Sequence, residues 1–316
     1  MSRKNIAIFG STGHIGKNLA YYFGKEKDCN LFLFTRDDEI DKNTRVECEL
    51  KNNFSIQNYN EFNDSKYDVV INCIGLGDPA KLELSSETIL ETTETFDNIA
   101  LDYLKSFPEC KLINFSSGVV YEGDFTSPIT ETTLIDETFD IKNIRSEYTV
   151  SKINSEIKHR KLNHLNIIDL RLFSFFSRFM DLQSKFFMSD VVSSIRLGST
   201  LIHGDDFFRD YIHPEDLFSF IQKCINKESI NDVFDLYSKM PIGSFTLLDA
   251  LHKKFHNFTY SRKEDLNDDT ITSPTGFKKY YFSKSRKAEL LGYKPKYSSL
   301  DTIFNELPYF LKDIPT

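Results

Sequence analysis

The stretch IAIFGSTGHIG, residues 6–16, decides the fold of this 316-residue chain. Its first four residues are an apolar run of the kind found in strands buried on both faces of a parallel sheet. Glycines follow at positions 10, 13 and 16 in the spacing GxxGxxG, and the helical spacing of Ile15, Leu19 and Phe23 runs on to Gly24. The stretch therefore predicts a strand, a tight glycine-rich turn and a helix.

A turn of this kind is typical of a phosphate site. Glycine is needed there because the backbone bends sharply, approaches a pyrophosphate and brings the helix close to the sheet. The helix N-terminus adds free N–H groups and a positive dipole. A tight turn without a ligand is the alternative, and His14 is expected either at the cofactor or in solvent. The residues expected to contact a dinucleotide here are Gly10, Thr12, Gly13, His14, Ile15 and Gly16.

Apolar runs and helical patterns alternate along the first half of the chain. We predict strands at 31–35, 69–74, 111–116 and 167–173, and helices at 88–107 and 144–162. This alternation predicts an α/β fold with a Rossmann-like, doubly wound parallel sheet. Further on, we predict helices at 216–225, 245–255, 284–291 and 300–311, a strand at 233–237 and a loop at 262–275.

Two domains are expected from the length and from the looser pattern after residue 171. The dinucleotide-binding domain would take residues 1–172 with part of 210–245. A smaller, mixed α/β substrate domain would take residues 173–209 and 246–316.

The composition excludes several classes of protein. Lys and Arg number 39 against 47 Asp and Glu, a net charge of −8, which argues against nucleic acid as the main partner because that task needs a basic surface. The sequence contains no run of 18 apolar residues, the length that would predict a membrane span. The N-terminus carries no signal-peptide pattern. The five cysteines are widely spaced and form no CxxC pair, so we expect reduced thiols, no metal site and a cytoplasmic location.

The end of the second predicted strand bears on the choice of cofactor. NAD-binding proteins usually place an acid there to hold the ribose 2′-hydroxyl, but this strand ends in Thr35-Arg36. Without the carboxylate a 2′-phosphate is not repelled, and Arg36 can pair with it, which favours NADP(H). The alternative is a solvated Arg36, with Asp37 or Asp38 holding the ribose.

The pattern YxxxK occurs three times, at Tyr21/Lys25, Tyr148/Lys152 and Tyr280/Lys284. Spacing alone does not separate them, because chance predicts about one match in a chain with this many Tyr and Lys. Position favours Tyr148 and Lys152, which share one face of a predicted helix. That helix follows the strand that ends in Ser116-Ser117, and ligands bind at the carboxyl ends of strands in such sheets.

With these pieces in order, the chain resembles the extended short-chain dehydrogenase/reductase family, whose members include nucleotide-sugar epimerases, dehydratases and ketoreductases. The matching segments span nearly the whole chain. They are GSTGHIG at 10–16, VVINCIG at 69–75, FSSGVVYEG at 115–123, YTVSK at 148–152, RDYIHPEDL at 209–217 and SKSRKAELLGYKP at 283–295.

The resemblance implies a catalytic set. Tyr148 would be the general acid/base, and Lys152 would lower its pKa and bind the nicotinamide ribose. Ser117 would hydrogen-bond the reacting oxygen, unless the register places Ser116 there or Ser117 only satisfies local backbone. The loop Cys73-Ile74-Gly75 would line the cofactor through its backbone.

The resemblance also implies a substrate subsite. Ser117 and Gly118 would border the sugar, and Arg209 would bind the diphosphate of a nucleotide-sugar, with a structural ion pair to Asp210 or Asp216 as the alternative. Ser174 stands where the family often has Asn, which leaves the diphosphate contact at that point in doubt.

The function predicted first is NADP(H)-dependent reduction of a keto group, at C4, on a nucleotide-linked sugar. The alternative is a nucleotide-sugar 4-epimerase with tightly bound NAD. Dehydration is discounted because family dehydratases place Asp-Glu where this chain has Gly118-Val119. A third hypothesis is a non-catalytic protein with the same fold, because fold does not fix function. The presence of Ser117, Tyr148 and Lys152 together argues against it. The resemblance implies a homodimer through the helices at 88–107 and 144–162.

Overall fold

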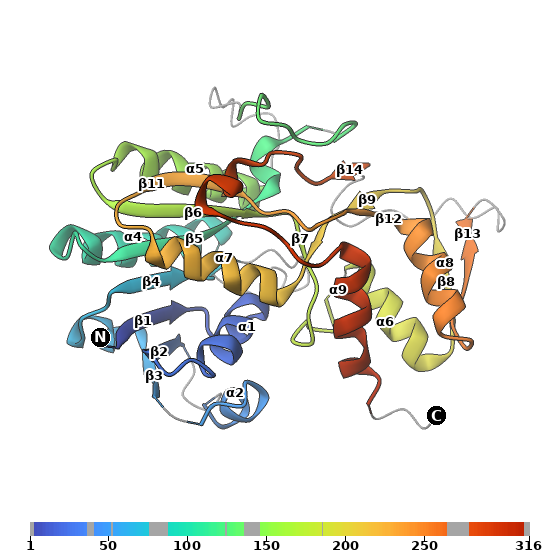
Figure 1. The fold of residues 1–316 in the computed structure, drawn as a ribbon, viewed down its shortest axis with the longest axis horizontal. Coiled ribbons are helices and arrows are strands. Elements are labelled where there is room, and N and C mark those ends of the chain that lie inside the picture. The colour runs from blue at the N-terminus through green and yellow to red at the C-terminus, as the bar shows by residue number, and fades with distance from the viewer. Residues whose placement is uncertain are drawn as a thin grey trace.

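The computed structural model describes residues 3–36, 41–51, 53–75, 88–123, 125–135, 146–184, 186–263 and 278–312. A seven-stranded sheet with every neighbouring pair parallel forms the larger part of the molecule (Figure 1). This confirms the predicted doubly wound α/β fold. The strands in spatial order are β3 (Phe54–Asn58), β2 (Cys29–Thr35), β1 (Lys4–Phe9), β4 (Val69–Asn72), β5 (Lys111–Ser117), β6 (Asn166–Leu172) and β11 (Asn231–Asp235).

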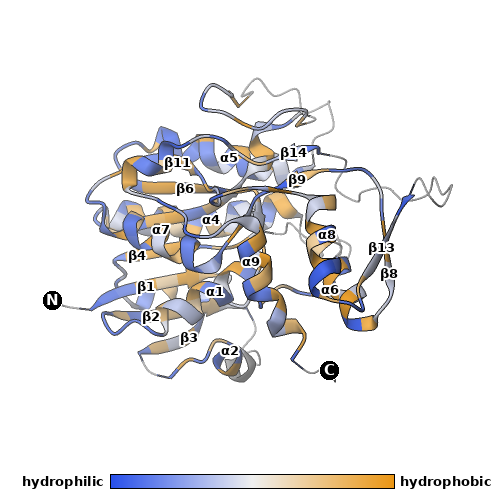
Figure 2. Ribbon diagram, turned by 45° about the vertical axis from the view of Figure 1, so that its right-hand side comes forward, coloured by the Kyte–Doolittle hydropathy of each residue, from blue (hydrophilic) through white to orange (hydrophobic). Residues whose placement is uncertain are grey.

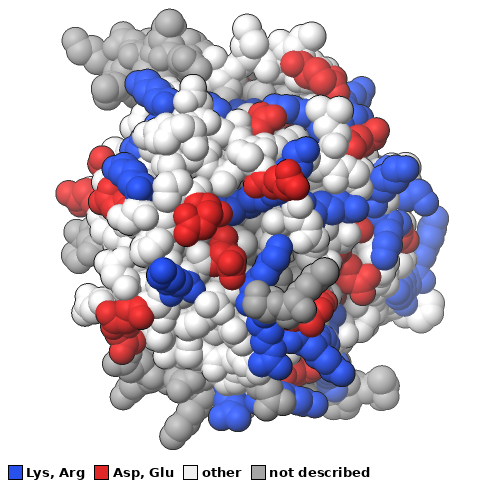
Figure 3. All heavy atoms as spheres, turned by 60° about the vertical axis from the view of Figure 1, so that its left-hand side comes forward, with Lys and Arg blue, Asp and Glu red and all other residues white. Residues whose placement is uncertain are grey.

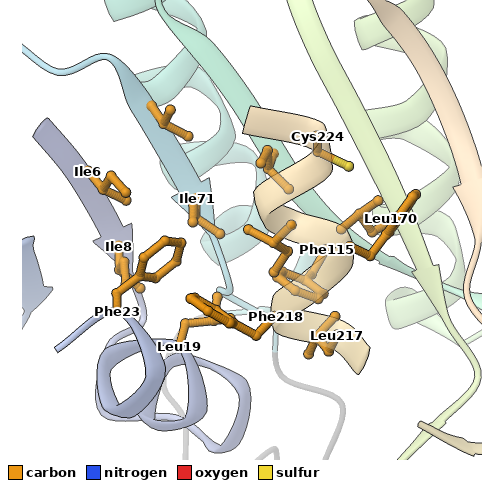
Figure 4. Packing of buried hydrophobic residues seen from close by; sticks show 14 of the residues in the cluster. Ile6, Ile8, Leu19, Phe23, Ile71, Phe115, Leu170, Leu217, Phe218 and Cys224 are labelled. Carbon is orange, nitrogen blue, oxygen red and sulfur yellow. The ribbon is translucent and has the colours of Figure 1, made fainter. Parts of the chain in front are cut away.

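Alternate side chains of the strands face two separate cores. Ile6 and Ile8 of β1 belong to the core beneath α1 (His14–Phe23) and α7 (Pro214–Asn226), whose packing is shown in Figure 4. Ala7 and Phe9 belong to the core beneath α4 (Ile89–Ser106). This alternation follows from the two-residue repeat of a strand, and it explains why the strands are apolar throughout.

Helix α5 (Glu147–Lys161) lies beside α4 on the same face of the sheet, and its buried side is polar. Lys152, Glu156 and His159 are buried along it. The apolar face predicted for the helix at 144–162 is only partly present, because Ile153 is buried whereas Val150 and Ile157 are half-buried.

A smaller region extends to the right of the sheet in Figure 1 and has its own apolar core. Its helices are α6 (Phe187–Leu197), α8 (Ser244–Lys254) and α9 (Ser299–Glu306). Separate small sheets of two or three short strands accompany these helices. They are β7 (Ser174–Phe175) with β10 (Tyr211–Ile212), β12 (Ile242–Gly243) with β9 (Phe208–Arg209) and β14 (Tyr280–Tyr281), and β13 (Thr259–Arg262) with β8 (Thr200–His203).

Hydropathy differs between the strands of the sheet and the helices around it. Figure 2 shows apolar residues along β1 and β6 of the sheet, whereas the surrounding helices carry both colours. On the face shown in Figure 3, acidic and basic side chains are interspersed, with one basic cluster at the lower right. All five cysteines are free. In the part of the chain that the structure describes, no helix is both long and apolar enough to cross a membrane.

Two predictions near the C-terminus were wrong in detail. The helix predicted at 284–291 is a short 3₁₀ helix, η5 (Lys287–Leu291). The hydroxyls of Ser283 and Ser285 accept hydrogen bonds from the backbone N–H groups of Ser285 and Lys287 and so compete with helix formation. The helix predicted at 300–311 ends as α9 at Glu306 and continues as 3₁₀ helix η6 (Leu307–Phe310) around Pro308. The loop predicted at 262–275 falls almost entirely outside the described residues.

Candidate active site

The glycine-rich turn has the geometry of a phosphate loop. Gly10 has φ of +68°, and a Cβ there would lie 3.2 Å from Cγ1 of Ile74. A Cβ on Gly16 would lie only 2.1 Å from the Gly10 carbonyl oxygen, so α1 rests directly on the turn. The turn and the loop after β4 meet between β1 and β4, where the strand order reverses and ligands bind in such sheets.

The outer side of this turn is open to a ligand. Gly13, the N-cap of α1, is exposed, and no side chain caps the helix. A Cβ on Gly13 would meet only the Gly10 carbonyl, at 3.3 Å. Thr12, Gly13 and His14 border a cleft of about 550 Å³ that extends along α1 to Lys17, Arg178 and Tyr309 and is not lined by Ser117, Tyr148 or Lys152. Uncapped N–H groups at a helix N-terminus fit a pyrophosphate, so the residues present suit a dinucleotide.

His14 takes a position that the sequence did not indicate. Its Nε2 lies 2.8 Å from Ser177 Oγ, and its ring packs against Phe175. Asn18 on the next turn of α1 donates to the same hydroxyl at 2.7 Å. His14 is therefore half-buried rather than in open solvent, and it links the phosphate loop to the segment that follows β7.

Thr35 and Arg36 stand at the carboxyl end of β2 as predicted. Thr35 is buried and Arg36 is exposed. Tyr59, in the 3₁₀ helix η2 (Tyr59–Asp64), lies beside them: its hydroxyl accepts the Gly10 N–H at 2.9 Å and donates to the Phe34 carbonyl at 3.3 Å. Asp37 and Asp38, the alternative ribose ligands, lie outside the described residues.

Lys152 joins α5 to the loop after β4. Its ammonium donates to the carbonyls of Phe115 at 2.7 Å and Ile74 at 3.3 Å. A Cβ on Gly75 would lie 3.2 Å from Lys152 Nζ and 3.9 Å from the Tyr148 ring, so these three residues lie next to one another. Burial lowers the pKa of Lys152 to about 8, although nearby carboxylates oppose the change.

Tyr148 and Ser117 lie together at the carboxyl end of β5. Burial raises the pKa of Tyr148, and its hydrogen bond with the Ser117 side chain opposes the rise. The ammonium of Lys152 lies 5.8 Å from the centre of the Tyr148 ring. Ser116, the alternative in the register, instead donates to Glu156 at 2.5 Å.

Two buried networks fix helix α5 and with it Tyr148 and Lys152. Glu156 binds the Arg171 guanidinium through both oxygens, at 3.0 and 2.5 Å. One turn later, His159 lies between Asp169 at 2.9 Å and Asp97 at 2.7 Å. Burial alone would lower the pKa of His159, but the two carboxylates outweigh it and raise the pKa to about 10. His159 is therefore a cation at neutral pH.

Arg209 is half-buried on β9 and makes no ion pair with Asp210 or Asp216. Its guanidinium donates to the carbonyls of Phe208 and Lys278 and lies 4.2 Å from the centre of the Phe207 ring. Asp210 accepts the Ser238 N–H, and Asp216 accepts the N–H groups of Lys296 and Tyr297. The structural ion pair considered as an alternative is therefore wrong.

Gly118 begins the 3₁₀ helix η3 (Gly118–Tyr121) directly after Ser117. Phe173 covers it so closely that a Cβ on Gly118 would lie 2.2 Å from the Phe173 ring. The next residue, Ser174, is half-buried in β7 and pairs with Tyr211. The described contacts do not join Ser174 to Ser117, Tyr148 or Lys152.

Tyr281 is the residue in the site that the sequence analysis missed. Its hydroxyl lies 3.1 Å from Ser117 Oγ, and both side chains are buried. The only signal was the neighbouring Tyr280/Lys284 pattern, whose tyrosine instead stacks on Phe208. No local spacing marks Tyr281, because it reaches Ser117 through the pairing of β14 with β9.

The profile of the NAD dependent epimerase/dehydratase family matches residues 6–236. No curated protein matches the sequence. Three solved structures show the same fold. UDP-glucuronic acid 4-epimerase from Bacillus cereus, in complex with UDP-glucuronic acid and NAD, has a TM-score of 0.79 and 18% identity, covering 97% of this chain and 98% of that one.

UDP-glucose 4-epimerase from Thermotoga maritima, with UDP-glucose, has a TM-score of 0.79 and 17% identity, covering 98% of this chain and 100% of that one. dTDP-glucose 4,6-dehydratase from Bacillus anthracis, in complex with NAD, has a TM-score of 0.76 and 16% identity, covering 98% of this chain and 97% of that one.

Proposed function

The chain belongs to the NAD dependent epimerase/dehydratase family, and from that premise we propose that it transfers hydride at a carbon of a nucleotide-linked sugar. The meeting of Ser117, Tyr148 and Lys152 at the edge of the sheet, beside an open phosphate loop, carries this proposal. A nicotinamide bound there would exchange a hydride with the sugar carbon.

The protein's own task is to hold and move a proton at the sugar oxygen. The Tyr148 hydroxyl gives up or takes this proton as the oxygen changes between carbonyl and alcohol. Ser117 donates a hydrogen bond that favours the phenolate form of Tyr148. Lys152 is anchored on two carbonyls of the cofactor loop and β5, and in our proposal it holds the ribose.

We propose that Arg209 binds the substrate diphosphate. Its guanidinium is half-buried and is held by two backbone carbonyls rather than by a carboxylate, so its positive charge is not neutralised by Asp210 or Asp216. A diphosphate would supply the missing negative charge and accept paired hydrogen bonds from the planar guanidinium. Ser174 would lie at the same subsite.

The proposed reaction is reduction of a C4 keto group with NADPH. Support for NADP(H) comes from β2, where Thr35 is buried and Arg36 is exposed at the strand end, so that a 2′-phosphate meets a cation there. No dehydration is proposed, because Phe173 occupies the space in which a side chain at position 118 would stand.

A 4-epimerase with tightly bound NAD is the second candidate. The two epimerases named above share the fold over almost the whole chain, and one of them holds NAD. The same tyrosine, serine and lysine would serve such a reaction, which differs in returning the hydride to the other face of the sugar.

The nucleotide released on denaturation of the purified protein separates the two candidates. An empty site that binds NADPH at least tenfold more tightly than NADH supports the reductase. Stoichiometric NAD supports the epimerase. The Arg36→Ala variant should weaken NADPH binding about tenfold and leave NADH binding unchanged, since the lost interaction is with the 2′-phosphate.

Turnover of Tyr148→Phe tests the catalytic assignment. Loss of the phenol should lower kcat by at least about a hundredfold on the accepted nucleotide-sugar, while cofactor affinity stays within twofold. Tyr21→Phe is the matched control, because Tyr21 belongs to the same sequence pattern but lies on the outer part of α1 under the Lys25 ammonium. Full activity in Tyr148→Phe would exclude the proposed chemistry.

Three broader expectations stay proposals. The cofactor would bind to residues 1–172 with part of 210–245, and the substrate to residues 173–209 and 246–316. A cytoplasmic location and a homodimer through α4 and α5 are proposed from the family resemblance. The exposed positions of both helices are polar, among them Glu94, Asn98 and Asn154, so a dimer there would be held by hydrogen bonds and ion pairs. Light scattering on the purified protein tests it.

A further inference from the structure

Tyr281 brings a third hydroxyl to the catalytic pair of Ser117 and Tyr148. Its Oη lies 3.1 Å from Ser117 Oγ. Its ring is held edge-on between Phe125 and Phe173, at 5.0 and 5.3 Å between ring centres. The side chain is buried, so this contact is a fixed part of the site.

The number of protons available decides which hydroxyl donates and which accepts among Tyr281, Ser117 and Tyr148. Burial raises the pKa of Tyr281, so its phenol keeps its proton. The Val119 N–H donates to Ser117 Oγ at 3.4 Å. A hydroxyl oxygen can accept a second hydrogen bond, and in our proposal the Tyr281 phenol, 3.1 Å away, donates it. Ser117 then has its own proton for the Tyr148 oxygen, in agreement with its lowering effect on the Tyr148 pKa.

The strand that carries Tyr281 is paired with the strand that carries Arg209. In the parallel pair β14 and β9, Tyr281 lies directly opposite Arg209. The Arg209 guanidinium is 5.6 Å from the centre of the Tyr281 ring, and Lys278 Nζ is 5.8 Å from it. A group bound at Arg209 would thus fix the strand that places the Tyr281 hydroxyl.

We propose that Tyr281 is a positioning residue that orients the Ser117 hydroxyl toward Tyr148 and the reacting oxygen, and that it couples this orientation to the subsite of Arg209. The proposal rests on the proposed function for its catalytic consequence, but the hydrogen-bond chain itself does not depend on the substrate. Binding energy from the unreactive part of a substrate would in this way serve the reacting centre.

The first test measures the hydrogen-bond chain without any substrate. A fluorinated tyrosine, whose phenol is more acidic, replaces Tyr148 in the full chain, and its ¹⁹F signal is followed against pH. We expect Tyr281→Phe to raise the apparent pKa of that residue by roughly half a unit or more, because Ser117 then donates to it less well. In a Ser117→Ala background the same change should have no effect. Tyr280→Phe is the control, since the Tyr280 ring stacks on Phe208 instead.

The second test measures turnover on a nucleotide-sugar. Tyr281→Phe should lower kcat about tenfold with little change in KM, and the double variant with Ser117→Ala should be no slower than Ser117→Ala alone. An unchanged titration in Tyr281→Phe, or an equal shift when Ser117 is absent, overturns the proposal. If no nucleotide-sugar is turned over, the proposed function fails, and the titration still decides the role of Tyr281.

Discussion

Helices α5 and α7 cover opposite faces of one sheet and are buried in opposite ways. Helix α7 turns Leu217, Phe220 and Cys224 toward the sheet. Helix α5 turns Lys152, Glu156 and His159 inward and buries them as deeply. The apolar helix contributes burial, whereas the polar helix contributes directed bonds, which fix the position and rotation of the helix that carries Tyr148.

The two modes of burial respond differently to change. An apolar contact has no preferred direction and tolerates small shifts, whereas a buried ion pair is costly to break because it leaves a charge without its partner. The helix that carries the residues we propose as catalytic is therefore the one whose position is specified most narrowly.

Removal of the buried carboxylate on α5 should have the largest effect. Glu156→Ala leaves the Arg171 guanidinium without its bidentate partner, and we expect a loss of about 3–5 kcal/mol in the free energy of unfolding. Urea denaturation measures it. A loss below about 1 kcal/mol would mean that α5 does not depend on its ion pair.

An apolar truncation on α7 provides the comparison. Leu217 is completely buried, and Leu217→Ala should lower the free energy of unfolding by about 3 kcal/mol through lost burial and a cavity. This loss should be the same at pH 6.5 and pH 9.5, since no charged group changes its surroundings. A strong dependence on pH would contradict the apolar description of α7.

The third prediction concerns pH and His159. Its pKa is raised to about 10 in the fold from an ordinary value near 6.5, so folded protein binds the proton more tightly. The stabilisation is complete below pH 6.5 and disappears as the pH rises through 10. The difference in unfolding free energy between the wild type and His159→Gln should fall by more than about 1.4 kcal/mol between pH 6.5 and 10.

A constant difference across that range would show that His159 is neutral in the fold. The alkaline limb is best recorded for both proteins in the same buffers, because Lys152 and Lys111, whose pKa values burial lowers to about 8, also titrate there. Taking the difference between the two proteins removes their contribution.

The smallest effect is expected on the exposed side of α5. Asn154 is exposed and lies two residues from Lys152 in the sequence. Asn154→Ala should change the free energy of unfolding by no more than about 0.5 kcal/mol, and should leave cofactor affinity unchanged. A larger loss would indicate that this face is covered, as the proposed dimer requires.

The secondary-structure elements that could be predicted from the sequence are those with a clear local pattern. The helix predicted at 88–107 is α4, Ile89–Ser106, because Thr88 and Glu91 form a capping box at its start. Strand β3 was missed, since its five residues FSIQN are short, partly polar and half-buried at the sheet edge. Helix α6 was missed among the Phe-rich segments.

The residues of the candidate site also divide into those that a local sequence pattern marks and those that it does not. Gly10, Ser117 and Lys152 follow strand or helix patterns that a sequence displays, so their places near the carboxyl ends of the strands could be predicted. Tyr281 and Ser117 are 164 positions apart, and their contact depends on the pairing of two-residue strands. Such short pairings have no hydrophobic repeat, and only the folded chain reveals them.

The close contact between Gly118 and Phe173 limits how this lineage can evolve. Gaining an acid at position 118 requires space, but a Cβ there would lie 2.2 Å from the Phe173 ring. Phe173 would have to shrink first, and such a truncation costs about 3–5 kcal/mol while bringing no new chemistry by itself. A descendant of this protein would therefore have to lose stability by truncating Phe173 before it could gain an acid at position 118. Selection for dehydration could act only after both substitutions.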